Sequence, residues 1–134
     1  MRVAIPVWRG QVSTVFDFAR RLLVVDVDDV RETNASEVPF EEESLTVRVR
    51  TLSRLGTEVL ICGTISHDLA KMVAGCGIEI VPFVKGPVKE VLVAFLADEI
   101  DDPRFLLSGS VSEARQQEAF KARPPAAGAD NPQA

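Results

Sequence analysis

Cysteine, histidine and aromatic residues are scarce in this sequence. Its 134 residues include two cysteines, one histidine, one tryptophan and no tyrosine. The cysteines, Cys62 and Cys76, form neither a CxxC pair nor the ligand spacing of a zinc site, which predicts a reduced, cytoplasmic setting. Few aromatic rings are available to stack on nucleic-acid bases. The composition therefore argues against a disulfide-stapled protein, a zinc finger and a base-stacking protein.

Long apolar runs and an excess of positive charge are also lacking. The longest uninterrupted apolar run is Val91 to Ala97, far shorter than the roughly 20 residues that span a bilayer. The start, MRVAIPV, leads directly into a strand pattern without the blocks of a signal peptide. Fifteen Lys and Arg against twenty Asp and Glu give a formal charge of −5, whereas nucleic-acid binding needs a basic face. We therefore expect a cytoplasmic protein with neither a membrane nor a nucleic acid as partner.

Short apolar runs predict the strands of one layered domain. Residues 10–14 break the pattern and predict a loop, while Asp28-Asp29 predicts a tight turn. A weaker pattern over residues 30–38 is followed by Pro39, which cannot donate a ladder hydrogen bond and predicts an edge strand. The stronger strand patterns lie at residues 3–7, 22–27, 59–62 and 78–83.

Two helices are predicted in the second half of the chain. The first begins after Ser66, which is a good N-cap residue, and ends at Gly75 and Gly77. The second begins at Gly86-Pro87, with Pro87 at its first position, and its apolar residues keep a helical spacing through Leu96. The apolar face of the first helix is expected to hold Leu69, Met72, Val73 and Cys76. Strands that alternate with helices predict an α/β domain with a mixed sheet.

Residues 45–55 fit two interpretations almost equally well. Leu45, Val47 and Val49 alternate with polar residues, as in a strand. Leu45, Val49, Leu52 and Leu55 also mark one face of a helix. Farther on, residues 104–107 are expected to pack back on the core, and residues 112–122 to form a loose helix. The final PPAAGADNPQA has no large apolar group and is expected to be disordered.

The order of these patterns resembles one known family. The motifs AIPV, VS..F..A, VVDV, LICG.IS..L, GIE.VP.V.G.V and EVL.AFL follow one another along the chain, and together they are similar to the dinitrogenase iron–molybdenum cofactor biosynthesis family. The resemblance implies a ribonuclease-H-like three-layer α/β/α fold with a five-stranded mixed sheet of order 3-2-1-4-5. It covers residues 1–109 as one domain, leaves residues 110–134 as a flexible C-terminal tail, and favours the helical interpretation of residues 45–55.

The resemblance also implies a function. The family includes small carriers of the nitrogenase cofactor, so we expect a non-catalytic accessory protein that binds an iron–sulfur or iron–molybdenum-type cluster, or its precursor. A larger metalloenzyme or a cofactor-assembly protein is the expected protein partner. Relatives often carry cysteine where Lys85 and Ser110 stand here, and soft thiolates are the usual ligands of such clusters. Cys62 and His67 would therefore carry more of any metal binding.

The implied strand order places a crevice beyond two central strands. The strands at residues 3–7 and 59–62 would lie side by side and parallel, and a ligand crevice opens where the chain winds away from them in opposite directions. Helix N–H groups after Ser66, together with Arg9, would favour a small anionic ligand. The predicted metal ligands are His67 and Cys62, and the predicted cofactor-binding residues are Trp8, Arg9, Ser13, Thr14, Gly63, Ser66 and His67.

Each of these residues also has an ordinary structural interpretation. His67 fits an exposed polar residue at a helix start, and Cys62 fits a core residue at the end of a buried strand. A two-metal nuclease needs clustered acids, but the first strand has none, and Asp26 and Asp28 lack acidic partners. The sequence also shows no nucleophile–base pair, so no enzyme is predicted. The alternative function is a protein–protein interaction module of the same fold without metal binding, with the acidic residues 41–43 at its edge.

Overall fold

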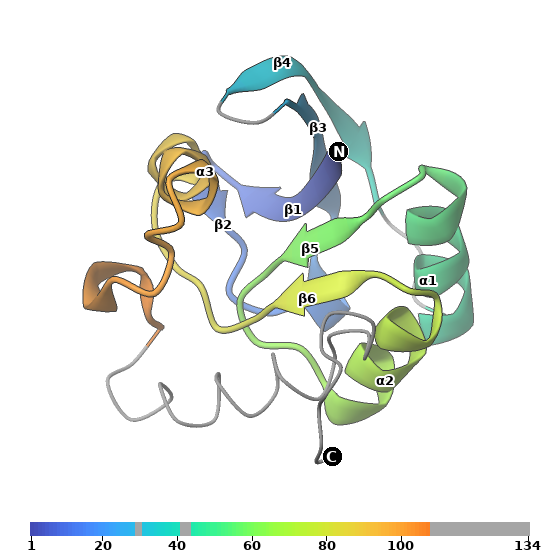
Figure 1. Ribbon diagram of the computed structural model, residues 1–134. Coiled ribbons are helices and arrows are strands. Elements are labelled where there is room, and N and C mark those ends of the chain that lie inside the picture. Colours follow the sequence, from blue (N-terminus) through green and yellow to red (C-terminus); the bar gives the residue numbers. More distant parts are fainter. Residues whose placement is uncertain (29–30, 41–43, 108–134) are drawn as a thin grey trace, which may run out of the picture.

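The computed structural model describes residues 1–28, 31–40 and 44–107. Several predictions concern residues outside this part. They are Asp29 of the predicted turn, the acidic residues 41–43, and the tail from Ser110 onward with its predicted helix 112–122. The elements follow the chain in the order β1 (Arg2–Trp8), β2 (Gln11–Val12), the 3-10 helix η1 (Phe16–Phe18), β3 (Arg21–Val27), β4 (Glu32–Pro39), α1 (Leu45–Arg54), β5 (Val59–Ile61), α2 (His67–Gly75), β6 (Glu79–Val81), α3 (Val88–Leu96) and the 3-10 helix η2 (Pro103–Phe105) (Figure 1).

The strands form one mixed sheet in the order β4-β3-β1-β5-β6, and the short β2 pairs with β1 outside this path. β1 runs parallel to β5, and β5 runs parallel to β6, whereas β3 is antiparallel to both of its neighbours. The predicted mixed α/β architecture is therefore confirmed. β4 lies at the edge, as Pro39 predicted.

A short hairpin replaces part of the loop predicted at residues 10–14. Gln11 and Val12 pair with Trp8 and Val7. The two residues between them, Arg9 and Gly10, have φ angles of 53° and 78°. Positive φ at both central residues is what a two-residue type I′ turn requires, and this turn matches the twist of the strands that it joins. The pattern of apolar residues predicted a loop because a two-residue strand is too short to show alternation.

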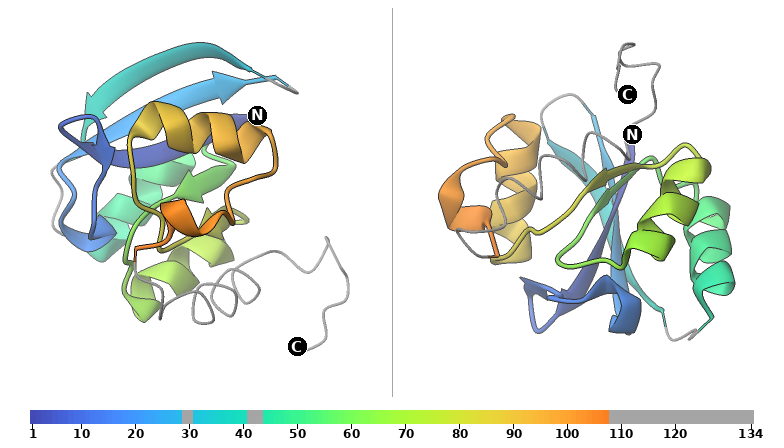
Figure 2. Two further views of the ribbon diagram at one scale, coloured as in Figure 1. Left: turned by 90° about the vertical axis from the view of Figure 1, so that its left-hand side faces the viewer. Right: turned by 90° about the horizontal axis from the view of Figure 1, so that it is seen from below.

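Helices cover both faces of the sheet, with α3 on one face and α1 and α2 on the other (Figure 2). Successive side chains of a strand point to opposite faces. Val3 and Ile5 of β1 therefore pack in the same core cluster as Val91 of α3. Ala4 of β1 joins the other cluster, which includes Leu52 of α1. The sheet is thus buried on both sides along its centre.

Residues 45–54 are helical, which decides between the two interpretations of that segment. Ser44 Oγ accepts a hydrogen bond from Val47 N at 3.4 Å and caps the first turn. The helical form buries Val49 and Leu52 on one side. Arg48 is also buried, 3% exposed, with its guanidinium carbon 4.6 Å from the centroid of the Phe40 ring. Tertiary packing therefore decided a segment whose periodicity was ambiguous.

Two predictions about helix ends need correction. Pro87 is the N-cap residue of α3 and has extended backbone angles, so the helix starts one residue later than predicted. Cys76 is the C-cap residue of α2 and is exposed, whereas a place on its buried face was predicted. The helix ends at Gly75, so its periodicity no longer fixes where the next side chain points. Phe105, in the segment expected to pack on the core, is 1% exposed.

No helix among the described residues is long and apolar enough to cross a bilayer.

Candidate functional site

Three loops meet at one edge of the sheet, which we call the carboxyl edge. β1, β5 and β6 point the same way, so the segments that follow them, residues 9–15, 62–66 and 82–87, leave the sheet on the same side (Figure 1). Backbone hydrogen bonds tie the first two segments together. Thr64 N donates to Thr14 O at 2.7 Å, and Phe16 N donates to Thr64 O at 2.7 Å. The loops after the two central strands therefore form one continuous backbone surface.

Gly63 makes this close approach possible. A Cβ atom at this position would lie 2.6 Å from Thr14 O and 2.7 Å from Ser13 O. Real Cβ atoms do not come so near to backbone oxygen, so any larger residue would push the two loops apart. The structure thus brings three of the predicted site residues into direct contact. The contact is made by backbone atoms, which leaves the side chains of Thr14 and Thr64 exposed at the surface.

Trp8 and Arg9 form an exposed pair at the end of the central strand. The Trp8 side chain is 59% exposed, and the guanidinium carbon of Arg9 lies 5.1 Å from the centroid of its ring. This distance is within the range of a cation–π contact. Arg9 also adopts the left-handed backbone region, with φ 53°, which is uncommon for a residue other than glycine, asparagine or aspartate. The turn therefore holds a cationic group and an indole face outward together.

The turn that carries this pair rests against the start of α3. Val88 N donates to Gly10 O at 2.9 Å, and Val12 N donates to Gly86 O at 3.0 Å. His67, in contrast, is the first residue of α2, on the opposite face of the sheet. The predicted site residues therefore fall along the whole carboxyl edge. Ser13, Thr14 and Gly63 lie where its two central loops cross.

The start of α2 carries a carboxylate that the sequence did not predict. Ser66 is the N-cap residue as expected, and its Oγ accepts from Leu69 N at 3.4 Å. Asp17 Oδ1 accepts from Ser66 N at 2.9 Å. The two residues are 49 positions apart, so no local sequence pattern predicts the contact. Asp17 already supplies negative charge at this helix end, which lessens its attraction for the anionic ligand that was predicted there.

Cys62 belongs to the core rather than to an open site. The residue is fully buried among the residues beneath α1 and α2. Burial raises the pKa of the Cys62 thiol far above its ordinary value, and the nearby charge of Asp17 raises it further. A metal needs the thiolate form, so in this conformation Cys62 is not suited to be a ligand. His67 is exposed and is the remaining predicted metal ligand.

Lys85 stands in the loop after β6, where the family resemblance leads one to expect a cysteine. The residue is exposed, and its N–H donates to Phe105 O at 2.8 Å. Phe83, two residues earlier, has φ 61°. Among the described residues, no three histidine, cysteine or acidic side chains gather in a way that would hold a metal ion.

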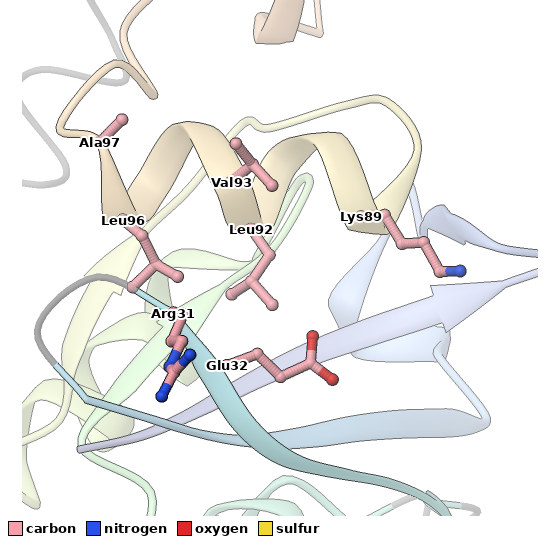
Figure 3. Close-up of a pocket in the computed structure, with 7 residues that line it drawn as sticks. All are labelled: Arg31, Glu32, Lys89, Leu92, Val93, Leu96 and Ala97. Carbon is pink, nitrogen blue, oxygen red and sulfur yellow. The ribbon is translucent and has the colours of Figure 1, made fainter.

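A hollow of about 510 Å³ lies between α3 and the first residues of β4. Figure 3 shows Leu92 and Leu96 of α3 directed toward it, with Arg31 and Glu32 on the far wall. None of the predicted site residues lines it. The periodicity of α3 located its buried face but gave no sign of this second, open surface.

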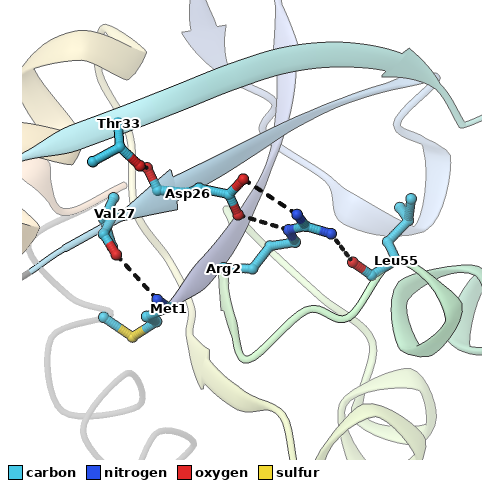
Figure 4. A network of polar contacts seen from close by, with 6 residues as sticks. All are labelled: Met1, Arg2, Asp26, Val27, Thr33 and Leu55. Atoms are coloured by element: carbon cyan, nitrogen blue, oxygen red, sulfur yellow. Dashed lines mark hydrogen bonds and ion pairs between the residues drawn. The ribbon is translucent and has the colours of Figure 1, made fainter.

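Asp26, one of the acids weighed for a nuclease, takes part in a structural network (Figure 4). Arg2 Nε donates to its Oδ1 at 2.8 Å, and Arg2 Nη1 donates to Leu55 O at 2.8 Å. Thr33 Oγ1 donates to the backbone O of Asp26 at 3.1 Å. The hydrogen bond from Arg2 lowers the pKa of the Asp26 carboxyl, although partial desolvation opposes the change. The network joins β1, β3, β4 and the end of α1.

Comparison with solved structures places this architecture among known α/β domains. The structure of the protein PH0822 has a TM-score of 0.70 and 24% identity, over 74% of this chain and 91% of that one. A protein of Methanocaldococcus jannaschii, provisionally titled a dinitrogenase, has a TM-score of 0.63 and 23% identity, over 74% and 90%. The apo form of the orange protein from Desulfovibrio gigas has a TM-score of 0.63 and 21% identity, over 73% and 88%. At these identities the likeness shows the shared fold alone.

The family is shown by the sequence itself. The sequence model of the dinitrogenase iron–molybdenum cofactor family matches residues 1–98. The chain therefore belongs to that family, as the order of its motifs predicted. A search of curated proteins finds none that matches the chain.

Proposed function

We propose that this chain is a small, non-catalytic accessory protein that carries an iron–molybdenum or iron–sulfur cluster, or its precursor, at the carboxyl edge. The membership of the family supports the nature of the cargo. The observation that carries the location is the 2.7 Å hydrogen bond from Thr64 N to Thr14 O, since it joins the loops after β1 and β5. Ligands of open α/β sheets bind beyond the strand ends where such loops meet.

The chemistry of the edge supports an anionic cargo held by few direct ligands. Arg9 and Lys85 bring positive charge to the edge of a chain whose formal charge is −5. Arg9 is held against Trp8 by the left-handed turn, so little side-chain freedom is lost when a ligand binds. We propose His67 as the metal ligand, with Ser13, Thr14, Gly63 and Ser66 contributing backbone and hydroxyl groups around it. Cys62 is left out because it is buried.

Three further expectations belong to this proposal. The partners are the cluster, or another small anionic ligand, and a larger metalloenzyme or cofactor-assembly protein that gives or receives it. The cytoplasm is the proposed location, since exposed clusters and free thiols persist in a reducing compartment. The layering of α3, the sheet, and α1 with α2 is proposed to be of the ribonuclease-H-like type.

Anaerobic loading tests the proposal. The protein is incubated with isolated iron–molybdenum cofactor, desalted, and analysed for iron and molybdenum content and for visible absorption. We expect bound metal in the wild type and its loss in His67→Ala. Arg54→Ala is the matched control, because Arg54 is exposed in the last turn of α1, away from the carboxyl edge. Absence of metal in the wild type would remove the carrier function, and full binding by His67→Ala would remove this ligand.

A second candidate is an interaction module of the same fold without metal binding. Its support is Phe18, whose side chain is 78% exposed in η1, next to the start of α2. Exposed aromatic residues are enriched where proteins dock. If this second function holds, the wild type binds no metal, and Phe18→Ser is expected to abolish co-elution with the partner protein while His67→Ala leaves co-elution unchanged. The two functions are thereby separated by one variant each.

A further inference from the structure

The outer face of α3 combines an apolar surface with charges in unusual places. Val93 is 67% exposed in the middle of the helix, and Ala97, one turn later, is exposed as well. Both residues line the hollow of about 510 Å³ beside β4, together with the inward-directed Leu92 and Leu96 (Figure 3). Exposed apolar side chains that are contiguous with an apolar hollow are typical of interaction sites.

Two charges at the ends of α3, those of Lys89 and Asp98, oppose the helix dipole. Lys89 lies in the first turn, where the helix end is positive, and Asp98 follows the C-cap residue, where it is negative. The last turn contains no basic residue. Acids are normally favoured at the first end and bases at the last. Glu90 alone follows the usual preference. Within one chain Lys89 and Asp98 are nine positions apart, about 13 Å along the helix axis, so they do not pair with each other.

We propose that α3 docks antiparallel on α3 of a second copy of this chain, around a two-fold axis at Val93. The axis brings Val93 against its own counterpart and places Lys89 beside Ala97 and Asp98 of the partner subunit. Each misplaced charge then lies at the end of the neighbouring helix that attracts it, and the small Ala97 leaves room for the lysine stem. Such a contact is isologous, so every interaction occurs twice. This self-complementarity favours a second copy over an unrelated protein.

The interface is small, so the dimer is expected to be weak. α3 has nine residues, and two such helices bury less than the roughly 800 Å² per partner of a standard interface. The exposed first residues of β4, across the hollow, extend the contact. We expect the average mass to rise with concentration between about 10 µM and about 1 mM. Added salt should lower it, because the Lys89–Asp98 pairs are screened.

Sedimentation equilibrium of the full chain tests the arrangement. Val93→Glu should raise the dimer dissociation constant by about tenfold or more, and its exposed site keeps the fold intact, as circular dichroism will show. Lys89→Glu and Asp98→Lys should each raise the constant by roughly threefold to tenfold. The double variant Lys89→Glu/Asp98→Lys should restore the constant in part, because the ion pair forms again while each charge now lies at the less favourable end of the neighbouring helix. Lys71→Glu, an exposed charge reversal on α2 across the sheet, is the matched control and should leave it unchanged.

Three results would overturn the proposal. The first is a wild-type protein that stays monomeric over the whole concentration range. The second is a dimer dissociation constant that Val93→Glu leaves unchanged, and the third is a double variant whose dissociation constant exceeds that of either single variant. The proposal is independent of the cargo, because its residues lie outside the carboxyl edge and the metal content of the protein is not part of the measurement.

Discussion

The carboxyl edge and the edge strand β4 are both margins of the same sheet, yet they are held in different ways. At the carboxyl edge, loops from distant parts of the chain are joined by 2.7 Å backbone hydrogen bonds and by the close approach at Gly63. β4 pairs with β3 at seven positions, but all of its residues except Val38 are exposed. A strand with one paired side and no helical cover contributes hydrogen bonds but little apolar burial.

The carboxyl edge should therefore be rigid, whereas β4 should tolerate substitution. Residues at the carboxyl edge are fixed by backbone contacts that a larger side chain at Gly63 would disturb, so the binding surface that we propose there would be preorganised. Residues of β4 meet water on both faces, so substitutions there change little. Substitutions and chemical modification on either side of this contrast should therefore differ in effect.

The reactivity of the two thiols should differ most. Cys76 is exposed and Cys62 is buried, and burial raises the pKa of the Cys62 thiol. Cys62 can react only after the structure opens, which costs about 5 kcal/mol or more and slows the reaction at least about 10³-fold. A disulfide reagent should therefore titrate one thiol rapidly in native protein and two in denaturant. Two rapid equivalents in native protein would show that the edge is open.

Gly63→Ala should cause a large loss of stability. The new Cβ atom would meet two backbone oxygens at 2.6 and 2.7 Å, and overpacking of this kind costs about 3 kcal/mol or more when backbone must move. Gly75→Ala is the matched control, because nothing lies within 4 Å of its added Cβ atom. Helix propensity predicts a gain of up to about 1 kcal/mol for that control. Equal urea midpoints for the two variants would contradict the expected difference.

Leu22 of β3 pairs with Val38 of β4. Substitutions at these two positions therefore compare the two strands directly. Leu22 is fully buried, so Leu22→Ala should lower the free energy of unfolding by about 2–5 kcal/mol. Val38 is only partly buried, and Val38→Ala should cost less than about 1 kcal/mol. Chemical denaturation measures both. Similar losses would mean that β4 is covered in solution.

The Arg2–Asp26 pair should give a small, pH-dependent effect. Because the hydrogen bond from Arg2 lowers the pKa of Asp26 in the folded protein, the contribution of the pair is present above the unfolded pKa of the carboxyl. It is lost as the pH falls through the lower, folded pKa. Wild type should therefore exceed Asp26→Asn in stability at neutral pH, and the gap should close in acid. A gap that is constant with pH would show that the ion pair contributes nothing.

Much of the fold was predictable because it depends on local patterns. The apolar runs at residues 3–7, 22–27 and 59–62 became strands since β-branched residues suit a buried sheet. Ser66 capped α2 because a hydroxyl at that position satisfies a free helix N–H. The order of motifs also identified the family. These features depend on residues that are near one another in the sequence.

The candidate site was predictable only in part, because its contacts join distant residues. The sequence indicated the loops after β1 and β5 but not Asp17, which reaches Ser66 across 49 positions. It also gave Cys62 two readings, ligand or core residue, and only the depth of the strand in the assembled core favoured the second. The left-handed turn at Arg9 was unpredictable, since that conformation is imposed by the pairing of β2 with β1.

Local sequence patterns were enough to predict the central strands, the capped start of α2, the edge position of β4 and the family. Periodicity left the state of residues 45–54 open until the tertiary structure showed a helix, and neither the exposure of Val93 on α3 nor the contact between the loops had a local signal. The physical reason is that periodicity and capping act over a few residues. Burial depends instead on which distant surfaces meet, and no short stretch of chain contains that information.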